Sequence, residues 1–165
     1  CGGDQTPYPR SELHYAHKHG RSLATSIEAA LEVNQRTPLH QRILHGPLKT
    51  AYGTVALEYL PEKKRDPWNY PVQVIQFGND LTLVALGTEV VIDYSLRIKQ
   101  ELFDPEGPAI WVAGYSNVYS GYIPSKRVLL EGGYEASRPY KPDVEERIIG
   151  KVLELDQGLK TQETK

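Results

Sequence analysis

The stretch LTLVALGTEVVIDYSLRIKQELFDPEGPAIWVAGY, residues 81–115, decides the fold predicted for this chain. It begins and ends with short apolar runs, LTLVAL and AIWVAGY, whose length and composition are typical of buried strands. A helical pattern separates them and predicts one amphipathic helix over residues 88–102. The apolar face of this helix consists of Val91, Tyr94, Ile98 and Leu102. A strand, a helix and a second strand in this order predict a right-handed βαβ unit with parallel strands.

The flanking segments extend this unit into an α/β domain with a mixed sheet and flanking helices. The run VQVIQF precedes LTLVAL, and the letters GND between them are typical of a β-hairpin. Residues 43–60 alternate and are rich in β-forming side chains, so they predict further strands. Helices with one apolar face are predicted over residues 11–33 and 143–157. We expect a single domain over residues 1–158 and a disordered tail over residues 159–165.

The composition is ordinary for a globular protein, with 39% hydrophobic and 24% charged residues in a chain of 165. The net charge of −2 argues against the dense basic surface that nucleic-acid binding needs. No apolar run approaches the ~20 residues of a membrane-spanning helix. The chain has one cysteine and no methionine, which suggests a mature, processed or fragmentary form. Cys1 is either the lipidated start of a lipoprotein or simply where this piece begins, and we favour the latter.

Two polar segments follow the two strands of the βαβ unit. Glu89 comes just after the first strand, and residues 117–122 come just after the second. Residues 117–122 belong to a tyrosine-rich stretch, residues 116–140, with the sequence SNVYSGYIPSKRVLLEGGYEASRPY. We predict that this stretch is a loop. In open α/β sheets, sites form just beyond the carboxyl ends of the strands. Because neighbouring parallel strands end at the same edge, we expect Glu89 and the tyrosine-rich stretch to meet there.

Three motifs, GDQTP, LGTEV and SNVYSGYIP with a later GGYEAS, occur in the order found in neutral ceramidases. The family pattern resembles G-D-x-S-P, then L-P-G-E, then N-x-Y-x-x-Y with a further Y-E twelve residues on. Tyr122 is followed twelve residues later by Tyr134 and Glu135. From Gly3 to about residue 137, the chain therefore resembles the later half of a neutral ceramidase catalytic domain. Members of that family are zinc amidases that split ceramide into sphingosine and a fatty acid.

The resemblance implies roles for three residues of the later motifs. Glu89 and Tyr122 would be zinc ligands, and Tyr134 would contact the substrate near the metal. Zinc accepts carboxylate oxygen, and catalytic zinc sites keep an open position for water. A phenol has a pKa of ~10, but a nearby dication stabilises its anion and would allow Tyr122 to bind zinc. Zinc would polarise the amide carbonyl and acidify its bound water.

The first motif departs from the family pattern. Thr6, close to Asp4, occupies the place of a serine that is regarded as the nucleophile or as a hydrogen-bonding helper of the zinc-bound water. Threonine keeps the hydroxyl but adds a methyl group that restricts its rotamers. We therefore favour attack by water, with Asp4, Thr6 and Tyr134 as the catalytic group. Gly87 and Thr88 stand in place of Pro-Gly, which changes the turn before the glutamate.

Each of these residues also has a simpler structural interpretation. A glutamate at the start of a helix, where Glu89 is predicted to lie, interacts favourably with the helix dipole. A loop tyrosine such as Tyr122 is commonly packed, with its hydroxyl hydrogen-bonded. We interpret Tyr115 and Tyr119 as packing residues, and Asn117 as a side chain that ties the loop backbone.

The segment HYAHKHG places His14, His17 and His19 on the first predicted helix. No HExxH pattern is present, so we interpret His17 as a partly buried structural residue and the other two as surface residues. The zinc histidines of the ceramidase family lie upstream of its G-D-x-S-P motif. This chain therefore supplies at most two zinc ligands, fewer than the three typical of catalytic zinc. We expect the histidine ligands to come from outside this chain, and the chain alone to bind zinc weakly or not at all.

Two hypotheses of function follow. The first is a zinc-dependent amide hydrolase that cleaves N-acyl sphingoid lipids such as ceramide and is completed by the preceding half of its catalytic domain. The second is a non-catalytic α/β binding or interaction domain derived from that family, or part of a lipoprotein. The first implies a lipid amide substrate, contact with a membrane surface, no nucleic acid, and an extracellular, periplasmic or cell-surface location.

Overall fold

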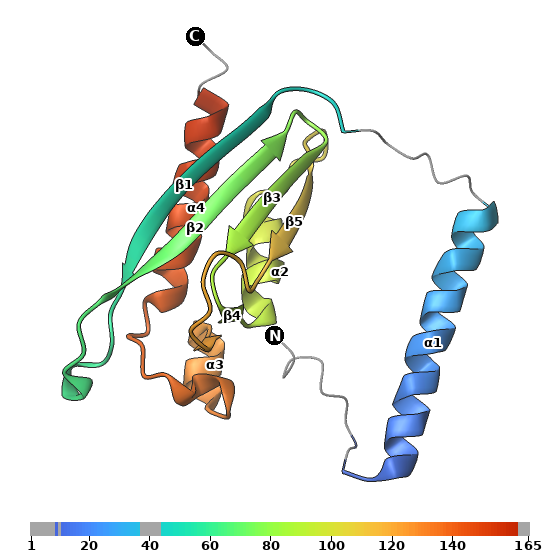
Figure 1. Cartoon of the computed structure of the whole chain (residues 1–165), viewed down its shortest axis with the longest axis horizontal. Helices are drawn as coiled ribbons and strands as arrows, with labels where there is room; N and C mark the ends of the chain where they lie inside the picture. Colours follow the sequence, from blue (N-terminus) through green and yellow to red (C-terminus); the bar gives the residue numbers. More distant parts are fainter. Residues whose placement is uncertain (1–8, 10, 37–43, 162–165) are drawn as a thin grey trace. The chain divides into compact units, whose positions relative to one another are not determined.

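The computed structural model describes residues 9, 11–36 and 44–161 (Figure 1). Its contacts define two compact units, one containing residues 11–36 and the other residues 44–161, and each is described by itself. The smaller unit has one helix, α1 (Leu13–Arg36). The elements of the larger unit are β1 (Leu48–Leu57), η2 (Pro61–Lys63), β2 (Trp68–Phe77), β3 (Leu81–Leu86), β4 (Glu89–Val90), α2 (Ile92–Glu101), β5 (Ala109–Ala113), β6 (Tyr122–Ile123), α3 (Lys126–Glu131), η3 (Glu135–Ser137) and α4 (Val144–Thr161). Among the described residues, no helix combines the length and the apolar character needed to cross a membrane.

The larger unit is built on a mixed sheet with the strand order β1-β2-β3-β5. The pairs β1–β2 and β2–β3 are antiparallel, whereas β3 and β5 are parallel, with Leu81 opposite Ala109. Helix α2 lies between β3 and β5 in the chain, so the predicted βαβ unit is present. A tight turn at Gly78, with a φ of +52°, joins β2 to β3 as the letters GND predicted. The predicted fold class, a mixed sheet with flanking helices, is confirmed.

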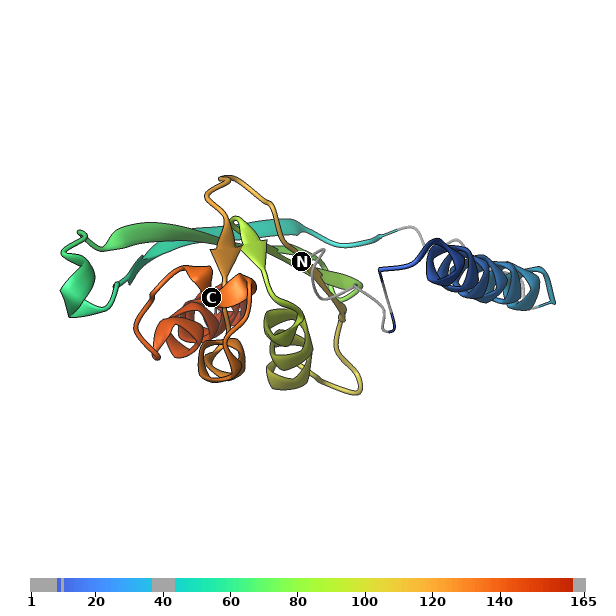
Figure 2. The same ribbon diagram turned by 90° about the horizontal axis from the view of Figure 1, so that it is seen from below.

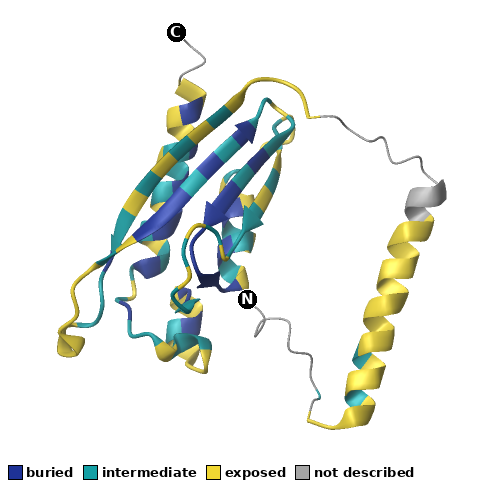
Figure 3. Ribbon diagram, viewed as in Figure 1, coloured by how far each residue is buried: buried dark blue, intermediate teal, exposed yellow. Residues whose placement is uncertain are grey.

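Helices α2 and α4 cover one face of this sheet (Figure 2). Alternate residues of β2 and β3 point to this face and are buried, as the dark blue segments of these strands show (Figure 3). The core that results includes Val72, Val74, Val84, Leu86, Tyr94, Ile98, Ile148 and Val152. Because burying one such side chain contributes roughly 1.5–3 kcal/mol, this layer is the main source of stability. On the opposite face, Tyr52 and Trp111 are exposed.

Two helices differ from their predicted limits. Helix α2 begins at Ile92 and not near residue 88, because Thr88 adopts a φ of +56°, outside the helical region. Glu89 therefore lies on the short strand β4, and the interpretation of Glu89 as a helix-start residue is wrong. Helix α4 continues beyond residue 157 to Thr161, since Leu159 is buried.

Residues 116–140 are more ordered than predicted. They contain β6, α3 and η3 instead of one loop. Helix α3 has an N-cap that sequence reasoning missed, in which the Val128 N–H donates to Ser125 Oγ over 3.1 Å. Residues 43–60, by contrast, contain one named strand, β1, among their described part. The tyrosine-rich stretch therefore consists largely of short, regular elements and not of one long loop.

Helix α1 has the predicted type but not a buried face. Its exposed apolar side chains are Leu13, Leu23, Ile27 and Leu31. His17 is exposed, so its interpretation as a partly buried residue is wrong. His19 is half-buried instead, because its Nε2 atom lies 2.8 Å from the carbonyl oxygen of Pro9. The expectation of one domain over residues 1–158 stays a prediction.

Candidate functional site

Two short strands at the carboxyl edge of the sheet bring the later motifs together. β4 follows β3, β6 follows β5, and the two short strands pair in parallel with Glu89 opposite Tyr122. The Glu89 N–H donates to the Gly121 carbonyl over 3.2 Å, and the Val91 N–H donates to the Ile123 carbonyl over 3.3 Å. Residues opposite each other in a strand pair project to the same side. The structure therefore brings Glu89 and Tyr122 side by side.

Tyr122 has both Glu89 and Tyr134 as neighbours. Glu89 is 9% exposed, Tyr122 is half-buried and Tyr134 is 74% exposed. The rings of Tyr122 and Tyr134 meet edge to face, with their centroids 5.3 Å apart. Desolvation and then the negative charge of Glu89 raise the pKa of Tyr122. In these surroundings the phenol stays protonated, and a cation beside it would be needed to favour its anion.

Tyr115 belongs to this cluster, although sequence reasoning assigned it to packing. The neighbouring Glu89 carboxylate, as a hydrogen-bond acceptor and a negative charge, is the main reason that the pKa of Tyr115 is raised to about 12. The ring of Tyr115 stacks with that of Tyr119 at a centroid distance of 6.4 Å. Tyr115 comes directly after a parallel strand, the same relation that singled out Glu89. That position was the signal that could have identified it.

Three non-glycine residues of this edge adopt the left-handed backbone that favours glycine. Their φ angles are +56° at Thr88, +56° at Tyr115 and +64° at Asn117. Hydrogen bonds hold this backbone, from the Thr88 N–H to the Val118 carbonyl (2.8 Å) and from the Tyr115 N–H to the Thr88 carbonyl (2.7 Å). The left-handed region costs most L-residues roughly 1–2 kcal/mol, and such strain is concentrated at functional sites. Asparagine tolerates it, so the role of Asn117 is this backbone conformation, and its predicted side-chain tie is not found among the described residues.

Arg138 supports the backbone beside Tyr122. Its Nη1 atom donates to Ser120 Oγ over 3.2 Å. A Cβ atom at Gly121, where φ is +87°, would lie 3.1 Å from the Arg138 guanidinium, so this position requires glycine. Sequence reasoning missed Arg138, because no local pattern links it to a segment that it contacts only through the tertiary fold.

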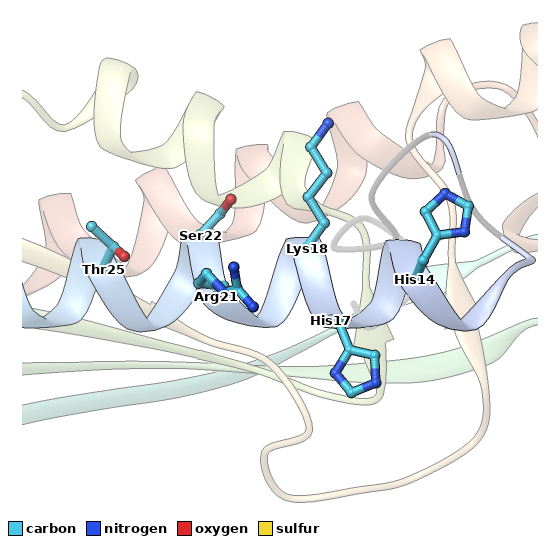
Figure 4. Close-up of a pocket in the computed structure, with 6 residues that line it drawn as sticks. All are labelled: His14, His17, Lys18, Arg21, Ser22 and Thr25. Atoms are coloured by element: carbon cyan, nitrogen blue, oxygen red, sulfur yellow. The ribbon is translucent and has the colours of Figure 1, made fainter.

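The other residues considered for the site lie outside the described residues or in the smaller unit. Asp4 and Thr6 lie outside the described residues, so their catalytic roles stay predictions. A hollow along α1 is lined by His14, His17, Lys18, Arg21, Ser22 and Thr25 (Figure 4). His14 and His17 point in different directions there, and His14 Nδ1 lies 3.2 Å from an exposed carboxylate, that of Glu12. The described part of the chain contains no group of three or more histidine, cysteine, aspartate or glutamate side chains that could hold a metal.

The fold of this chain is similar to that of a solved ceramidase. A structure described as a ceramidase complexed with C2 matches 67% of this chain with a TM-score of 0.50 and 14% sequence identity. The chain spans 30% of that ceramidase. No family model matches the chain, and neither does any curated protein. The likeness shows a ceramidase-like fold.

Proposed function

We propose that this chain contributes part of the active site of a zinc-dependent amide hydrolase, with Glu89 and Tyr122 as zinc ligands. The pairing of Glu89 with Tyr122 across β4 and β6 carries the proposal, because it joins two motifs that are far apart in the sequence. The ceramidase-like fold supports the proposal. The resemblance of the motifs around Glu89 and Tyr122 to those of neutral ceramidases supports it independently.

Glu89 and Tyr122 have side chains that can bind zinc, but two ligands are fewer than a catalytic zinc site usually has. The carboxylate of Glu89 is an ordinary zinc ligand, and Tyr122 would bind as a phenolate. Catalytic zinc is commonly held by three protein ligands, so we propose that histidines from outside this chain complete the set. When bound, zinc would polarise the substrate carbonyl and lower the pKa of its water.

The chain's own residues hold and orient the reacting groups in this proposal. The hydroxyl of Tyr115 is the hydrogen-bonding neighbour of the Glu89 carboxylate, which it helps to orient in this proposal. The exposed hydroxyl of Tyr134 donates to the carbonyl oxygen as that oxygen gains negative charge, which is the role of an oxyanion-hole donor. Thr6 positions the attacking water, with Asp4 close to it in the chain.

We propose an N-acyl sphingoid lipid such as ceramide as the substrate. The solved ceramidase with this fold is described as complexed with C2, which supports a related ligand here. The exposed rings of Tyr119, stacked with Tyr115, and of Tyr134, packed on Tyr122, offer apolar surface at this edge, as a lipid delivered from a membrane surface needs. An extracellular, periplasmic or cell-surface location suits that substrate.

Release of fatty acid from an N-acyl sphingosine by the complete catalytic domain tests this function. We expect hydrolysis that depends on added zinc and that is lost in Glu89→Gln, because a neutral amide is a poorer zinc ligand than a carboxylate. The matched control is Glu131→Gln, which neutralises an exposed carboxylate on α3. Undiminished hydrolysis in Glu89→Gln would contradict the proposal.

A non-catalytic binding domain is the second candidate. It is supported by the lack of a three-ligand metal cluster among the described residues. This candidate predicts that the complete domain binds the lipid amide but releases no fatty acid at any zinc concentration.

A further inference from the structure

A fully buried tyrosine, Tyr70 of β2, holds the turn that carries Glu89. Its hydroxyl donates to the Gly87 carbonyl over 2.8 Å, and Gly87 lies two residues before Glu89. The turn is tightly packed, since a Cβ atom at Gly87 would lie 2.9 Å from Val118 Cγ1 and 3.2 Å from Pro71 Cγ. Tyr70 therefore sets where the backbone enters β4.

A second fully buried tyrosine, Tyr94 of α2, holds the segment that follows Tyr122. Its hydroxyl donates to the Pro124 carbonyl over 3.0 Å, and Pro124 lies two residues after Tyr122. Ser125, the next residue, is the N-cap of α3, so the chain is held again immediately beyond this point. Tyr94 therefore sets where the backbone leaves β6.

We propose that Tyr70 and Tyr94 are positioning residues that set the separation of the Glu89 carboxylate from the Tyr122 phenol. The strands β4 and β6 have two residues each, and a pair this short is too weak to hold a fixed geometry alone. The two hydrogen bonds hold the strands from outside, one on the Glu89 side and one on the Tyr122 side. This inference rests on the proposed function, because it assumes that these two groups act together.

The hydroxyl groups matter here separately from the packing of the rings. Burial raises the pKa of both Tyr70 and Tyr94 well above the usual value, so both remain donors at neutral pH. Phenylalanine fills nearly the same space and removes only the donor, leaving a buried carbonyl without its partner. Tyr140 is a matched control, because it is also fully buried, but its ring stacks on that of Tyr59 and, among the described residues, its hydroxyl holds no backbone carbonyl beside Glu89 or Tyr122.

The experiment compares Tyr70→Phe, Tyr94→Phe and Tyr140→Phe by NMR of the chain, with the side chains of Glu89 and Tyr122 labelled with carbon-13. We expect Tyr70→Phe to shift mainly the Glu89 carboxylate signal and Tyr94→Phe to shift mainly the Tyr122 ring signals. Tyr140→Phe should move neither. Replacing Tyr70 or Tyr94 with 4-aminophenylalanine, which keeps a donor, should return the signals towards the wild-type positions.

A zinc titration of the same samples, with imidazole supplied as the nitrogen ligand, measures the consequence for the site. Outer partners of metal ligands typically change metal affinity by about 10–100-fold, so Tyr70→Phe and Tyr94→Phe should each weaken zinc binding by about 10-fold or more. Tyr140→Phe should leave the affinity unchanged.

The two readouts separate this inference from the proposed function. If the wild-type chain binds no zinc even with imidazole supplied as the missing ligand, while the signals of Glu89 and Tyr122 respond as expected, the positioning role stands and the zinc function fails. If Tyr70→Phe and Tyr94→Phe leave both signals where Tyr140→Phe leaves them, the positioning role is overturned. Each hydroxyl is tested separately, so one variant that fails to fold leaves the other to decide.

Discussion

Two buried carboxylates, Asp156 and Glu89, lie at opposite ends of the strands of one sheet and have different neighbours. At the edge where β3 begins, Asp156 of α4 accepts a hydrogen bond from Gln76 over 2.9 Å and pairs with Lys160 over 2.7 Å. At the edge where β3 ends, the neighbour of the Glu89 carboxylate is the hydroxyl of Tyr115, whose pKa the carboxylate raises. The first carboxylate is engaged by an amide and an ammonium group of its own chain, which is the arrangement expected of a structural group.

The backbone differs between these edges as well. Gln76 and Thr82 sit opposite each other in regular strands and line a cavity of about 140 Å³. Thr88 and Tyr115, by contrast, both occupy the left-handed region. Strain that persists in a well-packed domain is typical of sites where function constrains the backbone. The comparison therefore fits a structural role for Asp156 and the proposed zinc-binding role for Glu89.

The largest expected effect concerns Tyr134, the proposed oxyanion donor at the edge with Glu89. In the complete catalytic domain, Tyr134→Phe should slow hydrolysis by ~10²–10³, because it removes one donor to the developing oxyanion. The zinc content should not change, since the Tyr134 ring packs on Tyr122 and is not itself a proposed ligand. The control is Tyr52→Phe, another exposed tyrosine, on the uncovered face of the sheet. Equal turnover in the two variants would break the comparison.

The second test makes the same chemical change at both edges. Asp156→Asn should lower the free energy of unfolding by about 1–2 kcal/mol, because a charged hydrogen bond and an ion pair are replaced by neutral contacts. Glu89→Gln should change it less, since a glutamine carbonyl can still accept from Tyr115. Urea unfolding of both variants measures this difference. A larger loss in Glu89→Gln would show that Glu89 is primarily structural.

The third test compares two buried threonines. Thr82 and Thr88 are both buried, and the hydroxyls of both have no partner among the described residues. Thr88→Gly relieves a left-handed backbone and should raise the free energy of unfolding by about 1 kcal/mol. Thr82→Gly should lower it by roughly 1–2 kcal/mol, because glycine weakens a strand interior and leaves a void. Thermal unfolding of the two variants gives the sign, and two losses of equal size would refute the strain at Thr88.

The smallest effect is the titration of Tyr115. The Glu89 carboxylate raises the pKa of Tyr115 to about 12, and Glu89→Gln removes its negative charge, so the phenol should ionise at lower pH. The unfolded chain releases this proton near pH 10 and the folded chain near pH 12. The contribution of Tyr115 to stability is therefore complete below about pH 10 and is lost as the pH rises towards 12. Ultraviolet absorption of tyrosinate measures the titration, and an identical curve in Glu89→Gln would disprove the contact.

Much of the fold was predictable because its elements are long and periodic. The runs LTLVAL and AIWVAGY and the helical pattern between them predicted the βαβ unit, and GND predicted the hairpin. The two-residue strands β4 and β6 were not predictable, since two residues carry no period. Threonine at 88 gave no hint of a left-handed backbone, because that region disfavours β-branched residues.

The candidate site was predictable in part for the same reason. Glu89 and Tyr122 follow parallel strands, which predicted that they would meet. Tyr70, Tyr94 and Arg138 act through contacts between segments distant in the sequence, and no spacing rule reveals such contacts. The exposed position of His17 was missed because an apolar helical face predicts burial only where another element packs on it, and the smaller unit contains one helix.

The central claim is that Glu89 and Tyr122 bind the same zinc ion. A zinc titration that follows NMR signals of both side chains tests it most directly. The chain, labelled with carbon-13 at the Glu89 carboxylate and the Tyr122 ring, is titrated with zinc in the presence of imidazole. The account predicts that both signals move with one shared affinity, that the Tyr122 response vanishes in Glu89→Gln, and that a label on Asp156 does not respond. A zinc response at Asp156 or at the histidines of α1, with Glu89 and Tyr122 unmoved, would contradict it.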